Sequence, residues 1–356
     1  MRLDPTTYPN RMRSTLLALL LLAAPSLHAA DYPPPVAHDF VVKDYRFASG
    51  ETLPEVRIHY VTIGTKGARN TVLVLHGTGG SSKQFLSPTF AGILFAPGGL
   101  LDASKYFIVI PDNIGHGASS KPSDGLHARF PHYDYDDMVD LQHRLLADGL
   151  GVDHLRLVMG TSMGGMQTWM WGERWPKMMD ALMPLASQPA QIAGRNRVWR
   201  KMAIDNIRSD PEWQNGEYKQ QPRSLTSAVQ LLLIVGSAPL FWQKTSPTRD
   251  DADHWLEGQM KTRLATNDAN DLLYALESSR NYDPSPNLEK IEAPLMAINS
   301  ADDFVNPPEL GMMETAMKRV KHGRYVLLPI SDQTRGHGTH TLPAVWGSYL
   351  AELLGK

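Results

Sequence analysis

The stretch 157–165 constrains the fold of this chain more than any other part of its sequence. It reads Leu-Val-Met-Gly-Thr-Ser-Met-Gly-Gly, so three apolar residues lead into a G-x-S-x-G pentapeptide with Ser162 at its centre. A helical pattern begins directly after it, which predicts a strand, a tight turn and a helix. Glycines permit so sharp a turn, and the serine hydroxyl is then exposed at a helix N-terminus, where an oxyanion is stabilised. The pentapeptide also occurs in ordinary turns, so the surrounding sequence has to decide its meaning.

Strand and helix patterns alternate on both sides of this turn. Continuous apolar runs, typical of strands buried on both faces, fall at residues 71–75, 106–110, 154–159, 181–186, 294–299 and 324–330. Helical periods fall at residues 133–150, 163–175, 308–320 and 342–354. Residues 39–47 and 55–63 instead alternate apolar and polar side chains, which predicts an antiparallel pair with a turn at Gly50. The whole pattern predicts an α/β fold with a mostly parallel sheet and helices on both faces.

The alternation of strands and helices stops between residues 187 and 292. This segment has only helical periods, at residues 195–207, 224–242, 252–264 and 267–279. We interpret it as a helical cap inserted into the α/β core. The predicted organisation is therefore a first part of the core at 31–186, the cap at 187–292 and a second part of the core at 293–356.

The N-terminus has the pattern of a secretory signal peptide. Arg2, Arg11 and Arg13 precede the apolar run 16–24, and small residues follow at Ala29 and Ala30. The run is short for a permanent anchor, although a retained anchor is the alternative. We therefore expect residues 1–30 to be removed near Ala29 and Ala30. The mature protein would then be periplasmic or secreted, without stable insertion in the membrane.

Composition narrows the kinds of partner and chemistry. A formal net charge of −2 gives no reason to expect nucleic acid as a partner. The chain has no cysteine, which excludes a thiol nucleophile, a thiolate metal site and disulfides. No His pair at helical spacing with a nearby carboxylate suggests zinc, and no metal or organic cofactor is predicted. The oligomeric state stays open, a homodimer included.

A nucleophilic serine needs a base and an acid that orients the base, and both follow Ser162 in the chain. Asp303 comes directly after one predicted strand, and His337 follows the next. The order Ser, Asp, His is that of the α/β-hydrolase fold, and the ends of parallel strands meet at one edge of the sheet. Asp302 and His340 are the alternatives. Pro307, four residues after Asp303, and Gly336, directly before His337, favour the first pair.

A glycine-rich loop follows the strand at 71–75 and reads His-Gly-Thr-Gly-Gly at residues 76–80. Its backbone can approach a ligand closely, and we expect the N–H of Thr78 to form an oxyanion hole with the N–H of Met163. A phosphate loop is excluded because no Gly-Lys-Ser/Thr follows. His76 and His116 are interpreted as residues that organise loops and not as bases.

Four motifs make the chain resemble the homoserine O-acetyltransferase branch of the α/β-hydrolase superfamily, over almost the whole mature length. They are G-T-S-M-G-G-M-Q at 160–167, R-K-M-A-I at 200–204 with D-P-E-W at 210–213 and G-E-Y at 216–218, D-A-N-D-L-L-Y at 268–274, and D-F-V-N-P-P-E at 303–309. The resemblance implies Ser162, Asp303 and His337 as the triad, with acylation of Ser162 and transfer of the acyl group to an alcohol. It also makes Arg200 a candidate for substrate binding.

The chain departs from that branch where the acceptor is bound. The family usually has Asp after the catalytic His, whereas this chain has Gly338, and the arginine of the family's T-Y-R-S cap helix has no counterpart at 235–237. Acetyl-CoA is cytoplasmic, so an exported protein would not meet it. We therefore expect an exported ester hydrolase acting on a small-molecule ester. The alternative is an acyltransferase to a small alcohol, and a lesser one is a catalytically inactive binding scaffold. The acyl chain, the alcohol and the pathway are not specified by the sequence.

Overall fold

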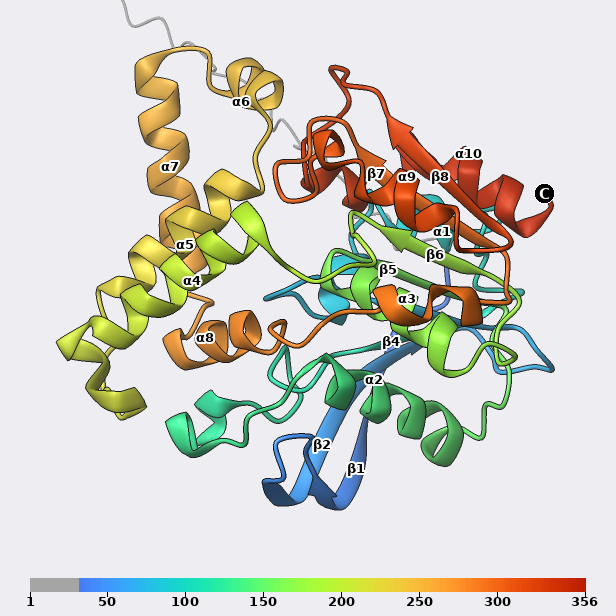
Figure 1. Cartoon of the computed structure of the whole chain (residues 1–356), viewed down its shortest axis with the longest axis horizontal. Helices are drawn as coiled ribbons and strands as arrows, with labels where there is room; N and C mark the ends of the chain where they lie inside the picture. The colour runs from blue at the N-terminus through green and yellow to red at the C-terminus, as the bar shows by residue number, and fades with distance from the viewer. Residues whose placement is uncertain (1–31) are drawn as a thin grey trace, which may run out of the picture.

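A computed structural model describes residues 32–356 (Figure 1), so the predicted signal peptide lies outside the described residues. The core is one sheet of eight strands in the order β1-β2-β4-β3-β5-β6-β7-β8. The strands are β1 (Val36–Arg46), β2 (Thr52–Ile63), β3 (Thr71–Leu75), β4 (Phe107–Pro111), β5 (Leu157–Thr161), β6 (Leu182–Leu185), β7 (Leu295–Ser300) and β8 (Gly323–Leu328).

The direction of each strand follows its sequence pattern. β1 and β2 form the antiparallel pair expected from their alternating side chains, and β2 pairs antiparallel with β4. From β4 through β8 the strands are parallel. The strands β3 to β7 are buried along their whole length, which is why they are mostly apolar. The carboxyl ends of β5, β7 and β8 therefore meet at one edge of the sheet.

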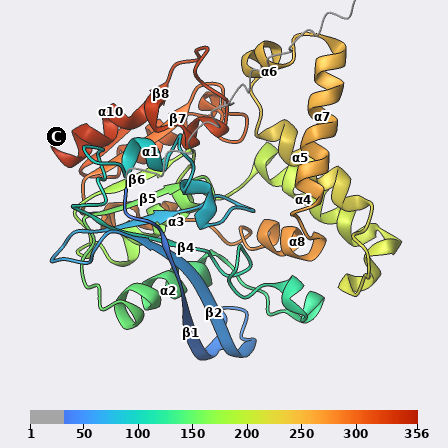
Figure 2. The ribbon, with the colours of Figure 1, turned by 180° about the vertical axis from the view of Figure 1, so that it is seen from behind.

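Helices cover both faces of the sheet. α2 (Tyr135–Arg144) and α3 (Met163–Arg174) pack on one face around Trp169 and Trp171, which are fully buried. α1 (Ala91–Leu94) and α10 (Pro343–Leu354) pack on the opposite face around Trp346, as the view from behind shows (Figure 2). α9 (Met312–Met317) lies between β7 and β8 in the chain. This layered arrangement confirms the predicted fold class.

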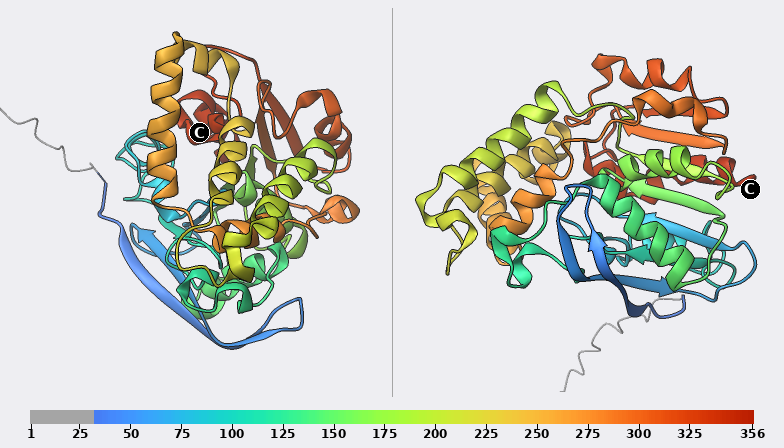
Figure 3. Two further views of the ribbon diagram at one scale, coloured as in Figure 1. Left: turned by 90° about the vertical axis from the view of Figure 1, so that its left-hand side faces the viewer. Right: turned by 60° about the horizontal axis from the view of Figure 1, so that its bottom comes forward.

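Five helices lie between β6 and β7 in the chain and gather at one end of the core (Figures 1 and 3). They are α4 (Gly194–Ser209), α5 (Ser224–Val235), α6 (Pro239–Thr245), α7 (Arg249–Leu264) and α8 (Ala269–Glu277). α4 and α8 contact each other and bury apolar side chains, whereas no residue of α6 or α7 is fully buried. We call α5, α6 and α7 the outer cap.

Three predicted helices differ from the structure. The helix predicted at 224–242 is wrong, because it is two helices, α5 and α6, that meet at 105°. Pro239 has no N–H to continue α5 and instead begins α6. The helix predicted at 133–150 is α2 followed by a π-helical turn, Leu145–Gly149. The helix predicted at 308–320 is a 3₁₀ turn, Pro308–Leu310, and then α9, separated by Gly311 in the left-handed conformation.

Among residues 32–356, no single helix is long and apolar enough to cross a membrane. Within this part of the chain, one bent pair, α5 and α6, has the required length and composition.

Candidate active site

The turn between β5 and α3 holds Ser162 in a strained backbone conformation. Its φ is 55° and its ψ is −112°, a region that side chains rarely adopt outside functional turns. The neighbouring glycines are required by space. A Cβ added at Gly160 would lie 2.1 Å from the Gly164 carbonyl oxygen, and one at Gly164 would lie 2.1 Å from the Leu75 carbonyl oxygen. The G-x-S-x-G pattern is therefore dictated by the close packing of α3 on β3 and β5.

The structure brings Ser162, His337 and Asp303 into one hydrogen-bonded line, although they are far apart in the sequence. His337 Nε2 lies 2.8 Å from Ser162 Oγ, and His337 Nδ1 lies 2.8 Å from Asp303 Oδ2. Ser162 is 8% exposed and Asp303 is 2% exposed. The carboxylate accepts the Nδ1 proton, so the tautomer that this geometry favours leaves the Nε2 lone pair facing the serine hydroxyl.

The loop at residues 303–307, here called the Asp303 loop, is built to keep its carboxylate ionised. The Asp303 Oδ1 accepts from the backbone N–H of Val305 at 2.8 Å and of Asn306 at 3.2 Å, and Oδ2 accepts from Asn306 Nδ2 at 3.0 Å. Burial alone would raise the pKa of Asp303, but the His337 charge and these hydrogen bonds hold it below its usual value. Sequence reasoning missed Asn306. Its place three residues after an aspartate at a strand end was the available signal.

The two alternatives from the sequence have other contacts. Asp302 accepts from Thr334 Oγ1 at 2.9 Å and from the Gly336 N–H at 3.1 Å, so it holds the loop that carries His337. The His340 ring lies edge-on to the His337 ring at 5.3 Å. Burial, and to a smaller extent the neighbouring His337, lowers the pKa of His340 to about 3. The Nδ1 of His340 has no hydrogen-bond partner among the described residues. Of these three residues, His337 is the one whose side chain forms a hydrogen bond with Ser162.

The two backbone donors expected to form an oxyanion hole lie on adjacent parts of the site. Met163 is the first residue of α3, and Thr78 follows Gly77, where an added Cβ would lie 3.4 Å from Ser162 Cβ. Within the described part of the chain, neither the Thr78 N–H nor the Met163 N–H donates to a protein acceptor. Both N–H groups are therefore available to a ligand.

Arg200 on α4 is a buried cation. It is 2% exposed, its Nε donates to Asn196 Oδ1 at 3.0 Å, and its Nη1 donates to Ser279 Oγ at 3.3 Å. No carboxylate of residues 32–356 forms an ion pair with it. Burial raises the pKa of Tyr135, whose hydroxyl lies near both Arg200 and Thr78 and has no hydrogen-bond partner of its own. Arg200 thus lies near the oxyanion loop, with its charge not neutralised by the protein.

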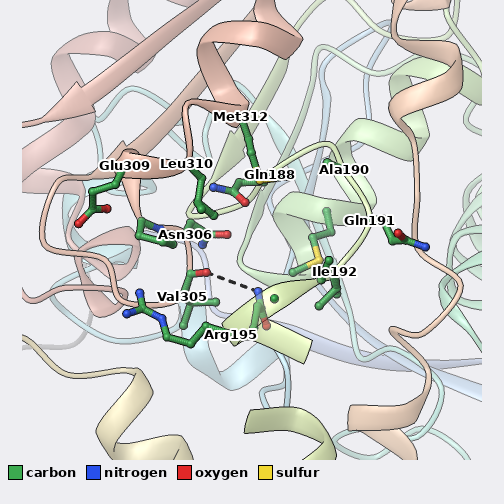
Figure 4. A pocket seen from close by; sticks show the side chains of 15 residues that line it. Gln188, Ala190, Gln191, Ile192, Arg195, Val305, Asn306, Glu309, Leu310 and Met312 are labelled. Carbon is green, nitrogen blue, oxygen red and sulfur yellow. Dashed lines mark hydrogen bonds between the residues drawn. The ribbon is translucent and has the colours of Figure 1, made fainter. Parts of the chain in front are cut away.

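A cavity of about 490 Å³ lies behind the Asp303 loop. Figure 4 shows Val305 and Asn306 on one side of it and Gln191 and Ile192, from the chain leading into α4, on the other. Asn306, which holds Asp303, forms part of the wall, but no member of the triad lines the cavity. In residues 32–356, no group of three or more His, Asp or Glu side chains is arranged to hold a metal ion.

Comparisons with known proteins agree with this fold. The family model for the alpha/beta hydrolase fold matches residues 70–327. A homoserine O-acetyltransferase of Pelobacter propionicus is 29% identical over 338 residues, which cover 83% of this chain and 90% of the relative.

Two solved structures have the same fold. The homoserine O-acetyltransferase from Bacillus anthracis has a TM-score of 0.80 at 22% identity, covering 90% of this chain and 98% of that one. The acetyl esterase MekB has a TM-score of 0.77 at 25% identity, and the match covers 90% of this chain and 97% of that one.

These relatives fit the acyltransferase hypothesis better than the exported ester hydrolase that we expected first. The chain is an enzyme that belongs to the α/β-hydrolase fold family and resembles its homoserine O-acetyltransferase branch.

Proposed function

We propose that this enzyme transfers acyl groups through a covalent intermediate on Ser162. The single observation that carries the proposal is the line of two 2.8 Å contacts from Ser162 Oγ through His337 to Asp303. His337 Nε2 takes the hydroxyl proton while Oγ attacks the carbonyl carbon of an ester or thioester. The Thr78 and Met163 N–H groups stabilise the oxyanion, and His337 then gives its proton to the departing alcohol or thiol. This leaves an acyl-Ser162 enzyme.

The second half of the reaction passes the acyl group to an acceptor. The acceptor hydroxyl gives its proton to His337 and attacks the acyl carbonyl carbon. The bond from this carbon to Ser162 Oγ then breaks, and His337 returns the proton to Oγ, which restores the free enzyme. The curated homoserine O-acetyltransferase relative supports a small alcohol as acceptor, and we propose this as the main activity.

Hydrolysis is the second candidate, with water as the acceptor. Gly338 stands directly after His337, where the family usually has an acceptor-binding Asp, and the similarity to an acetyl esterase points the same way. Export through the segment 1–30 remains part of this second proposal, because an exported enzyme would not meet cytoplasmic acyl donors.

Arg200 is proposed to contact a negatively charged group of the substrate. A buried cation without a counter-ion is costly, and a substrate carboxylate would lower that cost. Arg200→Met should therefore weaken turnover of esters that carry a carboxylate more than turnover of neutral esters. The matched control is Lys201→Met, which changes an exposed cation next in sequence and should affect both ester classes equally little.

The experiment that tests the activity measures how the acyl-enzyme partitions. The purified protein is given a nitrophenyl ester with and without a small alcohol such as homoserine. Nitrophenol release, carboxylic acid and new ester are then quantified. Formation of new ester as the main product supports transfer, and carboxylic acid at every acceptor concentration supports hydrolysis. Unchanged turnover by Ser162→Ala would contradict both, and failure of a fluorophosphonate to label Ser162 would favour the inactive scaffold.

A further inference from the structure

His76, at the end of β3, is held in one tautomer by two buried contacts. Its Nδ1 lies 2.8 Å from the Gly77 carbonyl oxygen, and its Nε2 lies 3.0 Å from the backbone N of Asn113. A carbonyl only accepts and a backbone N–H only donates, so Nδ1 carries the proton and Nε2 does not. The ring is completely buried, and burial lowers the pKa of His76. The side chain is therefore a neutral imidazole that donates to Gly77.

The carbonyl that His76 binds belongs to the same peptide group as the Thr78 N–H. A second donor, the Gly80 N–H, reaches the Gly77 oxygen at 2.9 Å. The described chain has no cis peptide bond, and in a planar trans peptide the C=O and N–H point in opposite directions. Two hydrogen bonds that fix the Gly77 carbonyl therefore also fix the direction of the Thr78 N–H, which donates to no protein acceptor within residues 32–356.

Three buried side-chain amides form a cluster next to His76. Its members are Asn113, Gln142 and Gln167, each no more than 2% exposed, and we call them the amide cluster. Gln142 Nε2 donates to Gln167 Oε1 at 2.8 Å and to Asn113 Oδ1 at 2.5 Å. Gln142 is on α2 and Gln167 is on α3, five residues after Ser162. The cluster thus connects the helix that carries the nucleophile to the loop that carries the oxyanion donor.

We infer that His76 is a positioning residue that orients the Thr78 N–H toward the oxyanion, and that the amide cluster holds His76 in place. The inference rests on the proposed acyl transfer through Ser162. It assigns a role to Gln167, the final Gln of the 160–167 motif, whose side chain is completely buried in the amide cluster. Its amide sets the spacing between α2, α3 and the 76–80 loop.

The test compares His76→Leu with the wild-type enzyme on a neutral nitrophenyl ester. Removal of a whole oxyanion donor costs about 10²- to 10³-fold in kcat, so a misoriented donor should cost about 10- to 100-fold, with KM little changed. A trifluoromethyl ketone forms a hemiketal oxyanion on Ser162. Its inhibition constant should rise by the same factor as kcat/KM falls, which a loss of folding stability alone would not produce.

Matched variants keep the result interpretable. His76→Gln keeps an N–H donor and should recover part of the lost rate. His116→Leu removes another buried imidazole, with its ring 5.2 Å from that of His76 but bonded to Ile114, and should leave the inhibition constant almost unchanged. Gln167→Met should give a loss of several-fold in kcat with a parallel change in the inhibition constant. This variant tests the inference even if His76→Leu does not fold.

Two results would overturn the inference while leaving the proposed function intact. One is an equal loss of activity in His76→Leu and His116→Leu. The other is an inhibition constant that stays constant while kcat falls. Turnover by Ser162→Ala would instead overturn the proposed function itself.

Discussion

The turn around Ser162 and the outer cap are stabilised in opposite ways. At the turn, Thr161 is completely buried, Ser162 is strained, and a Cβ added at Gly160 or Gly164 would collide with a backbone carbonyl. In the outer cap, α6 and α7 have no buried residue, and Ile234 and Leu240 are more than half exposed. Geometry that chemistry depends on is thus held by close packing and hydrogen bonds. α7 lacks such constraints, so we expect substitutions there to affect the chemistry least.

The largest effect is expected within the triad. Asp303→Asn replaces an acceptor by a side chain that can donate to His337 Nδ1. The imidazole would then adopt the wrong tautomer, with its Nε2 proton facing Ser162, and kcat should fall by about 10³- to 10⁴-fold. Asp302→Asn is the control, because Asp302 binds Thr334 and Gly336 of the loop that carries His337 and not the imidazole itself. Its replacement should cost about tenfold or less. Steady-state kinetics on one ester measures both, and equal losses would show that Asp303 has no special role.

Replacement of a glycine by alanine should have opposite effects on stability in the two regions. Gly164→Ala would force a Cβ against the Leu75 carbonyl at 2.1 Å and should destabilise by about 3 kcal/mol or more. Gly258→Ala, in the middle of α7 with nothing within 4 Å of an added Cβ, should stabilise by about 0.5–1 kcal/mol. Urea unfolding of both variants measures the difference. A similar change in the two would mean that the turn is less tightly packed than described.

A smaller effect is expected at the far end of α3. Burial raises the pKa of Glu173 to about 8, and its Oε1 has no partner. Between the ordinary pKa of glutamate and about 8, the unfolded chain is ionised while the folded protein keeps the proton. Folding stability therefore falls as the pH rises through this window.

The stability of Glu173→Gln relative to the wild type should accordingly grow from about pH 4.5 to pH 8 and stay constant above pH 8. Discounted for partial solvent exposure, the advantage should reach about 1–2 kcal/mol. The free energies of unfolding of Glu173→Gln and of the wild type, measured at pH 4.5 and pH 8.5, test this. If the variant's advantage over the wild type were the same at both pH values, the raised pKa of Glu173 would be contradicted.

Much of the core could be predicted from the sequence because its constraints are local. The runs 71–75 and 106–110 predict β3 and β4 within one residue, since a strand buried on both faces has to be apolar throughout. The strand predicted at 154–159 begins at Leu157 and extends into the turn, because the hydrogen bonds to β3 and β6 continue to Gly160 and Thr161.

The features that sequence reasoning missed depend on contacts between distant segments. The break between α5 and α6 was hidden because a run of apolar residues outweighed Gly236 and Pro239. The amide cluster could not be recognised from the sequence, because a buried asparagine or glutamine has a positioning role only when its partners are known. The position of Asp303 beside His337 followed from strand order, whereas the contacts of Asp302 with Thr334 and Gly336 required the folded loop.

The most direct test of the central claim is mass spectrometry of the enzyme mixed rapidly with a nitrophenyl ester and quenched in acid. Covalent catalysis through Ser162 predicts one added acyl group per chain, located on the peptide that contains this serine. It also predicts no added group in Ser162→Ala. An acyl group on another residue, or turnover of the ester with no acylated enzyme at any time, would contradict it.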